Sequence, residues 1–242
     1  MTSLNLDLAA GRARRGPRWP GTFRDGHARN DVAVRPRAVV VGANINGLGI
    51  VRSLGQAGVD VIVAGTSPWQ PAFHSRYATG ARRFAALHGP AFLDDLLHLG
   101  RSLSDRPMLF VTTDWTVRTV SEHRELVAER YRLRLPRRDR VEMLVNKVLF
   151  QQFAEQHGLP VPRALVIRGE RDLAGLADLG FPVIVKPCTT DHVERERVLR
   201  ARRAWSRGEA ERVCRTLLHG IKDDVIVQEW IEGPDSEIYF CL

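Results

Sequence analysis

The chain has 242 residues, of which 44% are hydrophobic and 26% charged, so it is long enough and apolar enough to bury a globular core. No segment approaches the roughly 18 consecutive apolar residues of a membrane span, and the N-terminus lacks the apolar stretch of a secretory signal. The three cysteines are far apart and fit no metal-ligand spacing, so we expect a reducing, cytoplasmic location.

The net charge of +8 is concentrated at the N-terminus. The first 37 residues hold eight arginines against three aspartates, in a Gly- and Pro-containing segment without hydrophobic periodicity. This composition predicts a disordered Arg-rich tail over residues 1–36. We therefore expect no specific nucleic-acid partner, although contacts of the tail with nucleic acid or membrane phosphates, and a role as an organellar transit peptide, stay open.

Ordered sequence begins near Arg37. Residues 38–41 form an apolar run that predicts a strand, residues 47–57 predict a helix that ends at Gly58, and residues 59–64 predict a second strand. A strand, helix and strand in this order indicate a βαβ unit and hence a parallel sheet.

The loop between the first strand and the helix is rich in glycine, but it departs from the dinucleotide-binding pattern. Asn44 occupies the position of the second glycine, and Gly65 follows the second strand where an acidic residue would hold a ribose. NAD is therefore not expected, and an NADP-binding Rossmann oxidoreductase remains an alternative. The favoured interpretation is that these glycines permit a tight turn and close helix packing.

Residues 67–89 contain many turn formers and predict an irregular segment. A helix is expected over residues 92–99 and a strand over residues 108–111. Asp114 follows that strand at the edge where open α/β sheets bind ligands, but we favour it as the N-cap of a helix over residues 116–130.

A capping-box pattern of Asp139 and Glu142 predicts one helix that runs to Gly158. Its expected buried face consists of apolar residues at helical spacing: Val141, Leu144, Val145, Val148, Leu149 and Phe153. Lys147 lies off this stripe, so the pattern alone predicts that it faces away from the core, into solvent.

The sequence then predicts a strand over residues 164–167, a helix over residues 172–179 and a strand over Val183–Lys186. That last strand is a branched apolar run between two prolines, and it ends on one of only three lysines in the chain. A lysine is a compact charge suited to phosphate, so Lys186 is either a phosphate ligand or a strand-end side chain in solvent.

Residues 188–205 are highly charged and contain no glycine. A helix over residues 209–219, a strand over residues 224–231 and a turn over residues 232–235 follow. A further strand is expected from Ser236, and the chain stops within it, as a truncated product would.

Three stretches together resemble the ATP-grasp superfamily, in particular its carboxylate–amine ligases of the D-aspartate ligase and carbamoyl-phosphate synthase large-chain type. The stretches are residues 146–162, with Asn146-Lys147 where the family has Asp-Lys, residues 181–187, and residues 227–235. The resemblance implies an α/β fold. A pre-ATP-grasp domain with a Rossmann-like parallel sheet would occupy residues 37–135, and the N-terminal lid part of an ATP-grasp domain, incomplete at its C-terminus, residues 136–242.

The resemblance also implies the nucleotide contacts. Lys186 would bind the α and β phosphates, and Lys147 would lie over the phosphates. The adenine edge would be bound by the backbone of four consecutive residues, Gln228, Glu229, Trp230 and Ile231. Asp235 or Glu237 would bind the ribose hydroxyls.

By the same resemblance, the whole enzyme would use ATP and Mg²⁺ to join a small carboxylate to an amine, both amino-acid-like, through an acyl phosphate. The Mg²⁺ ligands are expected downstream of Leu242, and no metal ligand or catalytic residue is assigned within the chain. We therefore predict that these 242 residues do not turn over. A non-catalytic ATP-binding or interaction module is the main alternative, and a homodimer is a further expectation.

Overall fold

The computed structural model of the chain describes residues 36–188, 201–220, 224–234 and 236. The predicted disordered tail, apart from Pro36, and the predicted ribose ligands Asp235 and Glu237 lie outside this range, as does nearly all of the strand expected from Ser236. Among the described residues, no helix combines the length and apolar character that crossing a bilayer requires.

The first half of the described chain builds a parallel four-stranded sheet with the order β3-β2-β1-β4. Its strands are β1 (Arg37–Val41), β2 (Asp60–Gly65), β3 (Ala78–Arg83) and β4 (Met108–Val111). The intervening helices are α1 (Ile45–Gln56), η1 (Pro71–His74) and α2 (Gly89–Ser102). The predicted βαβ unit and parallel sheet are thus confirmed.

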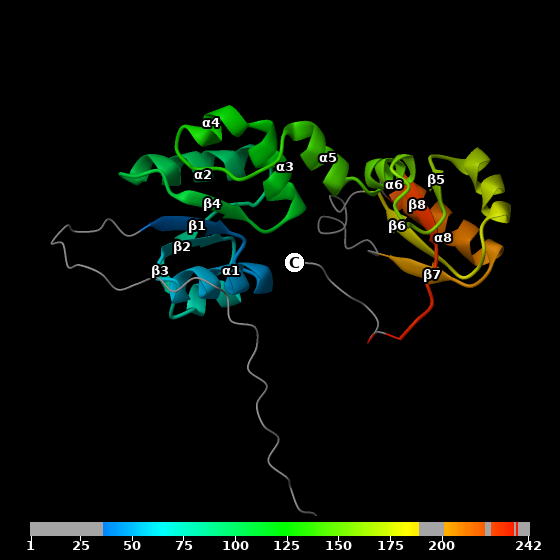
Figure 1. The fold of residues 1–242 in the computed structure, drawn as a ribbon, viewed down its shortest axis with the longest axis horizontal. Coiled ribbons are helices and arrows are strands. Elements are labelled where there is room, and N and C mark those ends of the chain that lie inside the picture. The colour runs from blue at the N-terminus through cyan, green and yellow to red at the C-terminus, as the bar shows by residue number, and fades with distance from the viewer. Residues whose placement is uncertain (1–35, 189–200, 221–223, 235, 237–242) are drawn as a thin grey trace, which may run out of the picture. The chain divides into compact units, whose positions relative to one another are not determined.

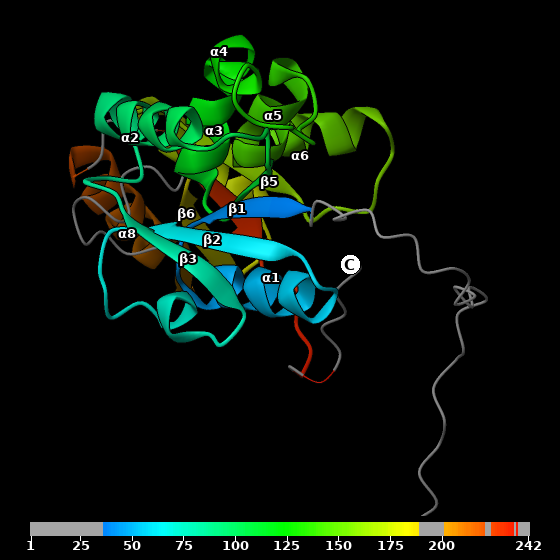
Figure 2. The ribbon, with the colours of Figure 1, turned by 90° about the vertical axis from the view of Figure 1, so that its left-hand side faces the viewer.

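Helices cover both faces of this sheet (Figures 1 and 2). The face toward α1 buries a cluster that includes Val40, Val51 and Val63, and the face toward α2 buries one that includes Val39 and Phe92. The alternation of Val39 and Val40 between the two clusters explains why β1 is apolar from Ala38 to Val41, because a strand covered on both faces has no solvent side.

The glycine loop after β1 serves close packing, as the favoured interpretation expected. Gly42 has a φ of +98°, and a Cβ added at Gly47 would lie 1.8 Å from the Gly42 carbonyl oxygen. Asn44 is the N-cap of α1, where its side chain accepts a hydrogen bond from Gly47 N at 3.1 Å.

The prediction that residues 67–89 are irregular is wrong, because they contain η1 and the edge strand β3. The side chains of β3 are mostly exposed, and the strand has a neighbour on one side only. Such a strand needs no buried apolar run, which is the pattern that would have revealed it.

The helix predicted over residues 116–130 is in fact two, α3 (Asp114–Glu122) and α4 (Arg124–Ala128), which meet at His123. The N-cap of α3 is Thr113 and not Asp114, because Thr113 forms a capping box with Thr116. Asp114 is instead the first residue of the helix, where its charge complements the helix dipole.

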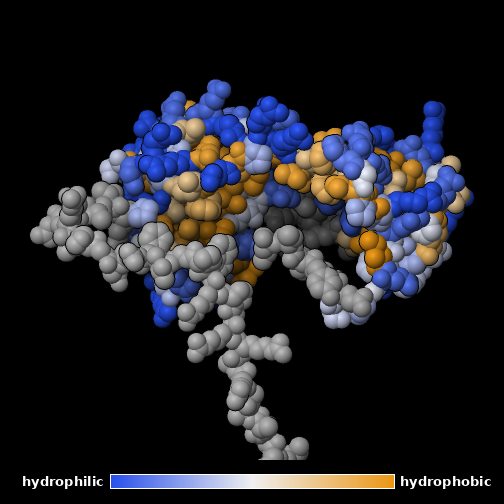
Figure 3. Space-filling view, in the orientation of Figure 1, coloured by the Kyte–Doolittle hydropathy of each residue, from blue (hydrophilic) through white to orange (hydrophobic). Residues whose placement is uncertain are grey.

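The helix predicted over residues 139–158 is also two, α5 (Arg138–Val145) and α6 (Lys147–Gln156). The predicted capping box is wrong: Arg137 is the N-cap, without a side-chain hydrogen bond, and Asp139 lies in the first turn. The break rotates the apolar stripe, so Leu144 and Leu149, predicted to be buried, are 57% and 41% exposed. Figure 3 shows apolar surface over these two helices.

The second half builds an antiparallel four-stranded sheet with the order β5-β8-β6-β7. Its strands are β5 (Ala164–Ile167), β6 (Val183–Pro187), β7 (Arg202–Ala204) and β8 (Val225–Glu229). The associated helices are η2 (Glu170–Asp178), a 3-10 helix, and α8 (Arg207–Gly220). Sequence reasoning missed β7, which is a three-residue edge strand with two exposed arginines.

The two faces of this second sheet are unlike each other. One face packs against η2 and α8 in a large core that includes Val183, Val185 and Val227. The other face packs against α6 in a small cluster that consists of Val148, Cys188 and Ile226, with Ala164 and Val166 at its edge. Because strand side chains alternate, Ile184, Lys186 and Gln228 lie on this second face, which we call the α6 face.

Candidate nucleotide site

Lys186 lies near the end of β6, on the α6 face and opposite Ile226 of β8. It is half-buried, and its Nζ donates a hydrogen bond to Gln228 Oε1 at 3.0 Å. Burial lowers the pKa of the Lys186 ammonium, and the positive charge of Lys147 lowers it further. The side chain is therefore held on the sheet surface beside a second cation, rather than extended into solvent.

Lys147 does not face away from the core as its helical pattern predicted. Both its backbone N–H and its Nζ donate to the Cys188 carbonyl oxygen, at 3.1 and 3.4 Å, so it is held at the end of β6. The cause is Asn146, whose extended backbone ends α5 and whose side-chain oxygen accepts from Val148 N and Leu149 N. Asn146 thus starts a new helix with Lys147 in its first position.

The predicted adenine-binding residues lie at and beyond the end of β8. Gln228 and Glu229 belong to the strand, whereas Trp230 and Ile231 follow it. The backbone N–H of Glu229 donates to the Arg163 carbonyl, and that of Trp230 to the Pro182 carbonyl, each at 3.0 Å. Within the described part of the chain, the N–H of Ile231 has no backbone partner, and this residue is 75% exposed.

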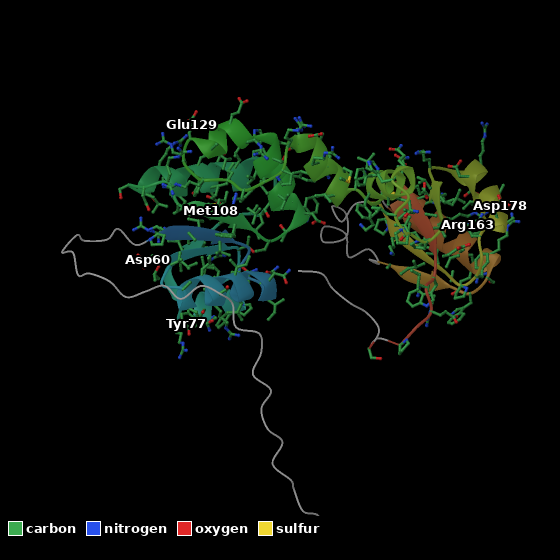
Figure 4. The ribbon with its side chains drawn as sticks, in the orientation of Figure 1. Asp60, Tyr77, Met108, Glu129, Arg163 and Asp178 are labelled. Atoms are coloured by element: carbon green, nitrogen blue, oxygen red, sulfur yellow. The ribbon has the colours of Figure 1, made fainter. Side chains whose placement is uncertain are left out.

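Glu229 is further fixed by its side chain. Its Oε1 accepts from Gly180 N at 2.8 Å and lies 3.7 Å from the guanidinium of Arg163, which is labelled in Figure 4. These contacts hold the end of β8 to the segments that precede β5 and β6. The backbone of Glu229 and Trp230, within the predicted adenine contact, is therefore anchored to the rest of the second sheet.

Arg203 of β7 is a cation that sequence reasoning did not single out. It lies opposite Ile184 in the sheet register, and its guanidinium contacts two tryptophan rings, 4.4 Å from the Trp205 ring centre and 4.8 Å from that of Trp230. The stack joins the edge strand β7 to the residues that follow β8.

Gln151 is the second residue that sequence reasoning missed. It lies on the buried side of α6 with Val148 and Ala154, is only 5% exposed, and bonds to the Gln228 side chain at 2.9 Å. A helix with its N-cap at Asn146 places Gln151 on the same face as Val148 and Ala154, so this helix start would have predicted a buried glutamine.

The residues around Lys147 and Lys186 can be tested for their fit to two ligands, a polyphosphate and a metal ion. Two ammonium groups that lie close together, with no carboxylate bonded to either among the described residues, suit a polyphosphate, since phosphate oxygens would satisfy their remaining donors. Among the described residues, no group of three or more His, Cys, Asp or Glu side chains could hold a metal ion.

No family model matches the chain. The chain is 25% identical over 213 residues to the D-aspartate ligase of Enterococcus faecium (strain Aus0004), which covers 83% of this chain and 51% of the relative. The chain therefore spans about half the length of the curated relative that it matches.

Solved structures agree on the fold. An ADP complex of N5-carboxyaminoimidazole ribonucleotide synthetase matches with a TM-score of 0.62 at 15% identity, over 82% of this chain and 48% of that one. The L-amino acid ligase of Bacillus licheniformis matches with a TM-score of 0.62 at 16% identity, over 83% and 45%. Both comparisons confirm the resemblance carried by the motifs: the chain is a homologue of D-aspartate ligase and has the fold of the ATP-grasp carboxylate–amine ligases.

Proposed function

We propose that the chain carries the nucleotide-binding lid part of an ATP-dependent carboxylate–amine ligase. The observation that carries this proposal is the approach of Lys147 and Lys186 at the end of β6, on the α6 face that also carries Gln228. The homologue and the shared fold support it.

In this proposal the two lysines bind the phosphates, and the backbone from Gln228 to Ile231 binds the adenine edge. The N–H of Ile231, which has no backbone partner among the described residues, is the donor best suited to an adenine ring nitrogen, since the N–H groups of Glu229 and Trp230 already bond to the chain. The ribose contact is assigned to Asp235 or Glu237, as the resemblance implies.

Bound ATP supplies the phosphoryl group that activates the carboxylate for attack by the amine. The contribution of Lys147 and Lys186 is to offset the charge of the phosphates where two anions must approach each other. We propose an amino acid for one of the joined substrates, with D-aspartate as the first to test because the relative's name specifies it. Mg²⁺ is part of the proposal for the whole enzyme, and none of the described residues is assigned to it.

The first test is calorimetric titration of the 242-residue chain with ADP in the presence of Mg²⁺. Lys186→Ala should weaken binding by about 10- to 100-fold, since a hydrogen bond to a charged group contributes about 1.5–3 kcal/mol and 1.4 kcal/mol is tenfold. Arg171→Ala is the matched control, because it removes a positive charge from η2, which packs on the opposite face of the sheet. Equal affinity of Lys186→Ala and the unmodified chain would refute the proposal.

The second test is for turnover. Mass spectrometry would follow ADP formation with ATP, Mg²⁺, D-aspartate and a panel of carboxylates. Binding without ADP formation matches the sequence-based prediction for these 242 residues and also fits the non-catalytic module, whereas ADP formation would refute both.

A further inference from the structure

A chain of side-chain hydrogen bonds leads from Lys186 into the interior of the second sheet. Lys186 Nζ donates to Gln228 Oε1 at 3.0 Å, and Gln228 Nε2 donates to Gln151 Oε1 at 2.9 Å. Gln151 Nε2 in turn donates to Glu155 Oε1 at 2.8 Å and to the Pro162 carbonyl at 2.9 Å. These contacts bring together residues that are 42 and 77 positions apart in the sequence.

The direction of both amides follows from the chemistry at the two ends. A lysine ammonium can only donate, and a carboxylate or a backbone carbonyl can only accept. Gln151 must therefore turn its NH₂ toward Glu155 and Pro162 and its oxygen toward Gln228. Gln228 must then turn its NH₂ toward Gln151, which leaves its oxygen for Lys186. Reversing either amide would bring two acceptors or two donors together.

We propose that Gln151 is a positioning residue that acts through Gln228 to aim the Lys186 ammonium at the nucleotide phosphates. The inference rests on the proposed function, which it deepens by adding two side chains to the phosphate site. We call the hydrogen-bonded side chains Gln151, Gln228 and Lys186 the relay. Gln151 is its anchored part, because it is 95% buried on α6 and bonds to two acceptors, Glu155 and the Pro162 carbonyl.

The relay meets a specific electrostatic need. Lys147 and Lys186 repel each other, so each ammonium must be held in place by an acceptor. Among the described residues, the acceptors are neutral: the Cys188 carbonyl for Lys147 and the Gln228 amide oxygen for Lys186. A carboxylate would hold the lysine as well, but it would also repel the phosphates. A neutral amide uses one of the three ammonium N–H groups and leaves two for the ligand.

The experiment is a double-mutant cycle on ADP binding, measured by calorimetry with Mg²⁺ present. The variants are Gln151→Met, Gln228→Met and the double variant, since methionine has a similar shape and no strong donor or acceptor. Each single variant should weaken ADP binding by about two- to tenfold, the range expected for one hydrogen bond. The double variant should be no weaker than Gln228→Met, because Gln151 acts only through Gln228.

A second readout needs no nucleotide. With only three lysines in the chain, NMR of ¹⁵N- and ¹³C-labelled lysine resolves the Lys186 ammonium, assigned with Lys186→Arg. Gln151→Met should shift the Lys186 signal although Gln151 does not bond to it. Gln151→Glu should shift it differently, because a carboxylate still accepts from Gln228 but has no N–H group to donate to Glu155 and Pro162. Packing changes alone would not single out this signal.

Several results would overturn the inference. They are additive losses in the cycle, wild-type ADP affinity in Gln151→Met, and an unmoved Lys186 signal in that variant. Failure of the proposed function looks different: the unmodified chain then binds no ADP, or binds it equally with Lys186→Ala. In that case the role of the relay in nucleotide binding is refuted as well. The NMR signal of Lys186 in Gln151→Met still decides whether Gln151 orients the Lys186 side chain.

Discussion

The Cys188 carbonyl oxygen accepts two hydrogen bonds from Lys147, one from its backbone N–H at 3.1 Å and one from its Nζ at 3.4 Å. A carbonyl has two lone pairs, so one acceptor satisfies both donors. The first of these N–H groups is one of those that the start of an α-helix leaves without a partner. The end of β6 therefore places both lysines of the candidate site, Lys186 within the strand and Lys147 through Cys188.

Replacement of Lys147 by methionine should weaken ADP binding by about 10-fold or more, because one of two phosphate cations is lost. The fold should be retained, since the backbone hydrogen bond to Cys188 remains. Calorimetry measures the affinity and thermal unfolding checks the fold. Lys147→Arg is the control, and it should keep most of the affinity through its charge; a loss as large as that of the methionine variant would contradict a phosphate role.

The pH dependence of ADP binding should show the lowered pKa of Lys186. The protonated ammonium binds phosphate, so affinity should fall as the pH rises through this pKa, at a lower pH than an ordinary lysine would give. Lys147→Met removes one cause of the lowering and should move the fall to higher pH. Calorimetry between pH 7 and pH 11 measures it, and a profile unchanged by Lys147→Met would contradict the coupling.

The free energy of unfolding should change with pH in the opposite direction to the ADP affinity: it should increase as the pH rises. Because the folded pKa of Lys186 is lowered, the folded state disfavours its charged form. This cost is present in full below the folded pKa and is relieved as the pH rises from the folded to the unfolded value.

Asn146→Ala should lower the free energy of unfolding by about 1 kcal/mol, because the two N–H groups of Val148 and Leu149 lose their cap. Urea denaturation measures this difference. Asn146→Asp is the matched control: its carboxylate accepts the same hydrogen bonds and lies favourably at a helix N-terminus, so stability should be retained. Equal losses in the two variants would show that the cap is not the cause.

Gly47 and Gly49 of α1 should respond in opposite directions to alanine. A Cβ at Gly47 would lie 1.8 Å from the Gly42 carbonyl oxygen, so Gly47→Ala must displace the loop after β1. It should cost about 1–3 kcal/mol of folding free energy, as overpacking typically does. A Cβ at Gly49 meets nothing within 4 Å, and Gly49→Ala should stabilise the helix by about 0.5–1 kcal/mol. Urea denaturation of both variants tests the pair, and stabilisation by Gly47→Ala would contradict the packing role of the loop.

The parts of the fold that could be predicted are those in which local pattern and tertiary structure agree. The strand β6 was predicted because branched apolar residues stand between Pro182 and Pro187, and it pairs as a central strand of its sheet. The edge strands β3 and β7 were missed, because an exposed strand carries no buried apolar run.

The break between α5 and α6 shows why the site was harder to predict than the fold. The apolar residues on either side of Asn146 fit one helical stripe, and this stripe outweighs the local signal of the break, which is the preference of asparagine for the N-cap position. What accompanies it is a hydrogen bond from Lys147 to Cys188, 41 positions away. The local pattern therefore predicted that Lys147 faces solvent, and only the family resemblance assigned this lysine to the phosphates. The contact between Gln151 and Gln228 spans 77 positions and has no local signal at all.

The alternation along β6 has a consequence for protein engineering. Val183 and Val185 are fully buried in the large core, whereas Ile184 and Lys186 are only partly buried on the α6 face. Substitutions at Val183 and Val185 should therefore affect mainly folding yield and solubility, whereas substitutions on the α6 face should affect mainly ligand choice. A combinatorial library aimed at a new nucleotide or phosphate donor can randomise Ile184 and its row neighbours Arg203 and Gln228 while the valines are left alone, and most of its members should still express as folded protein.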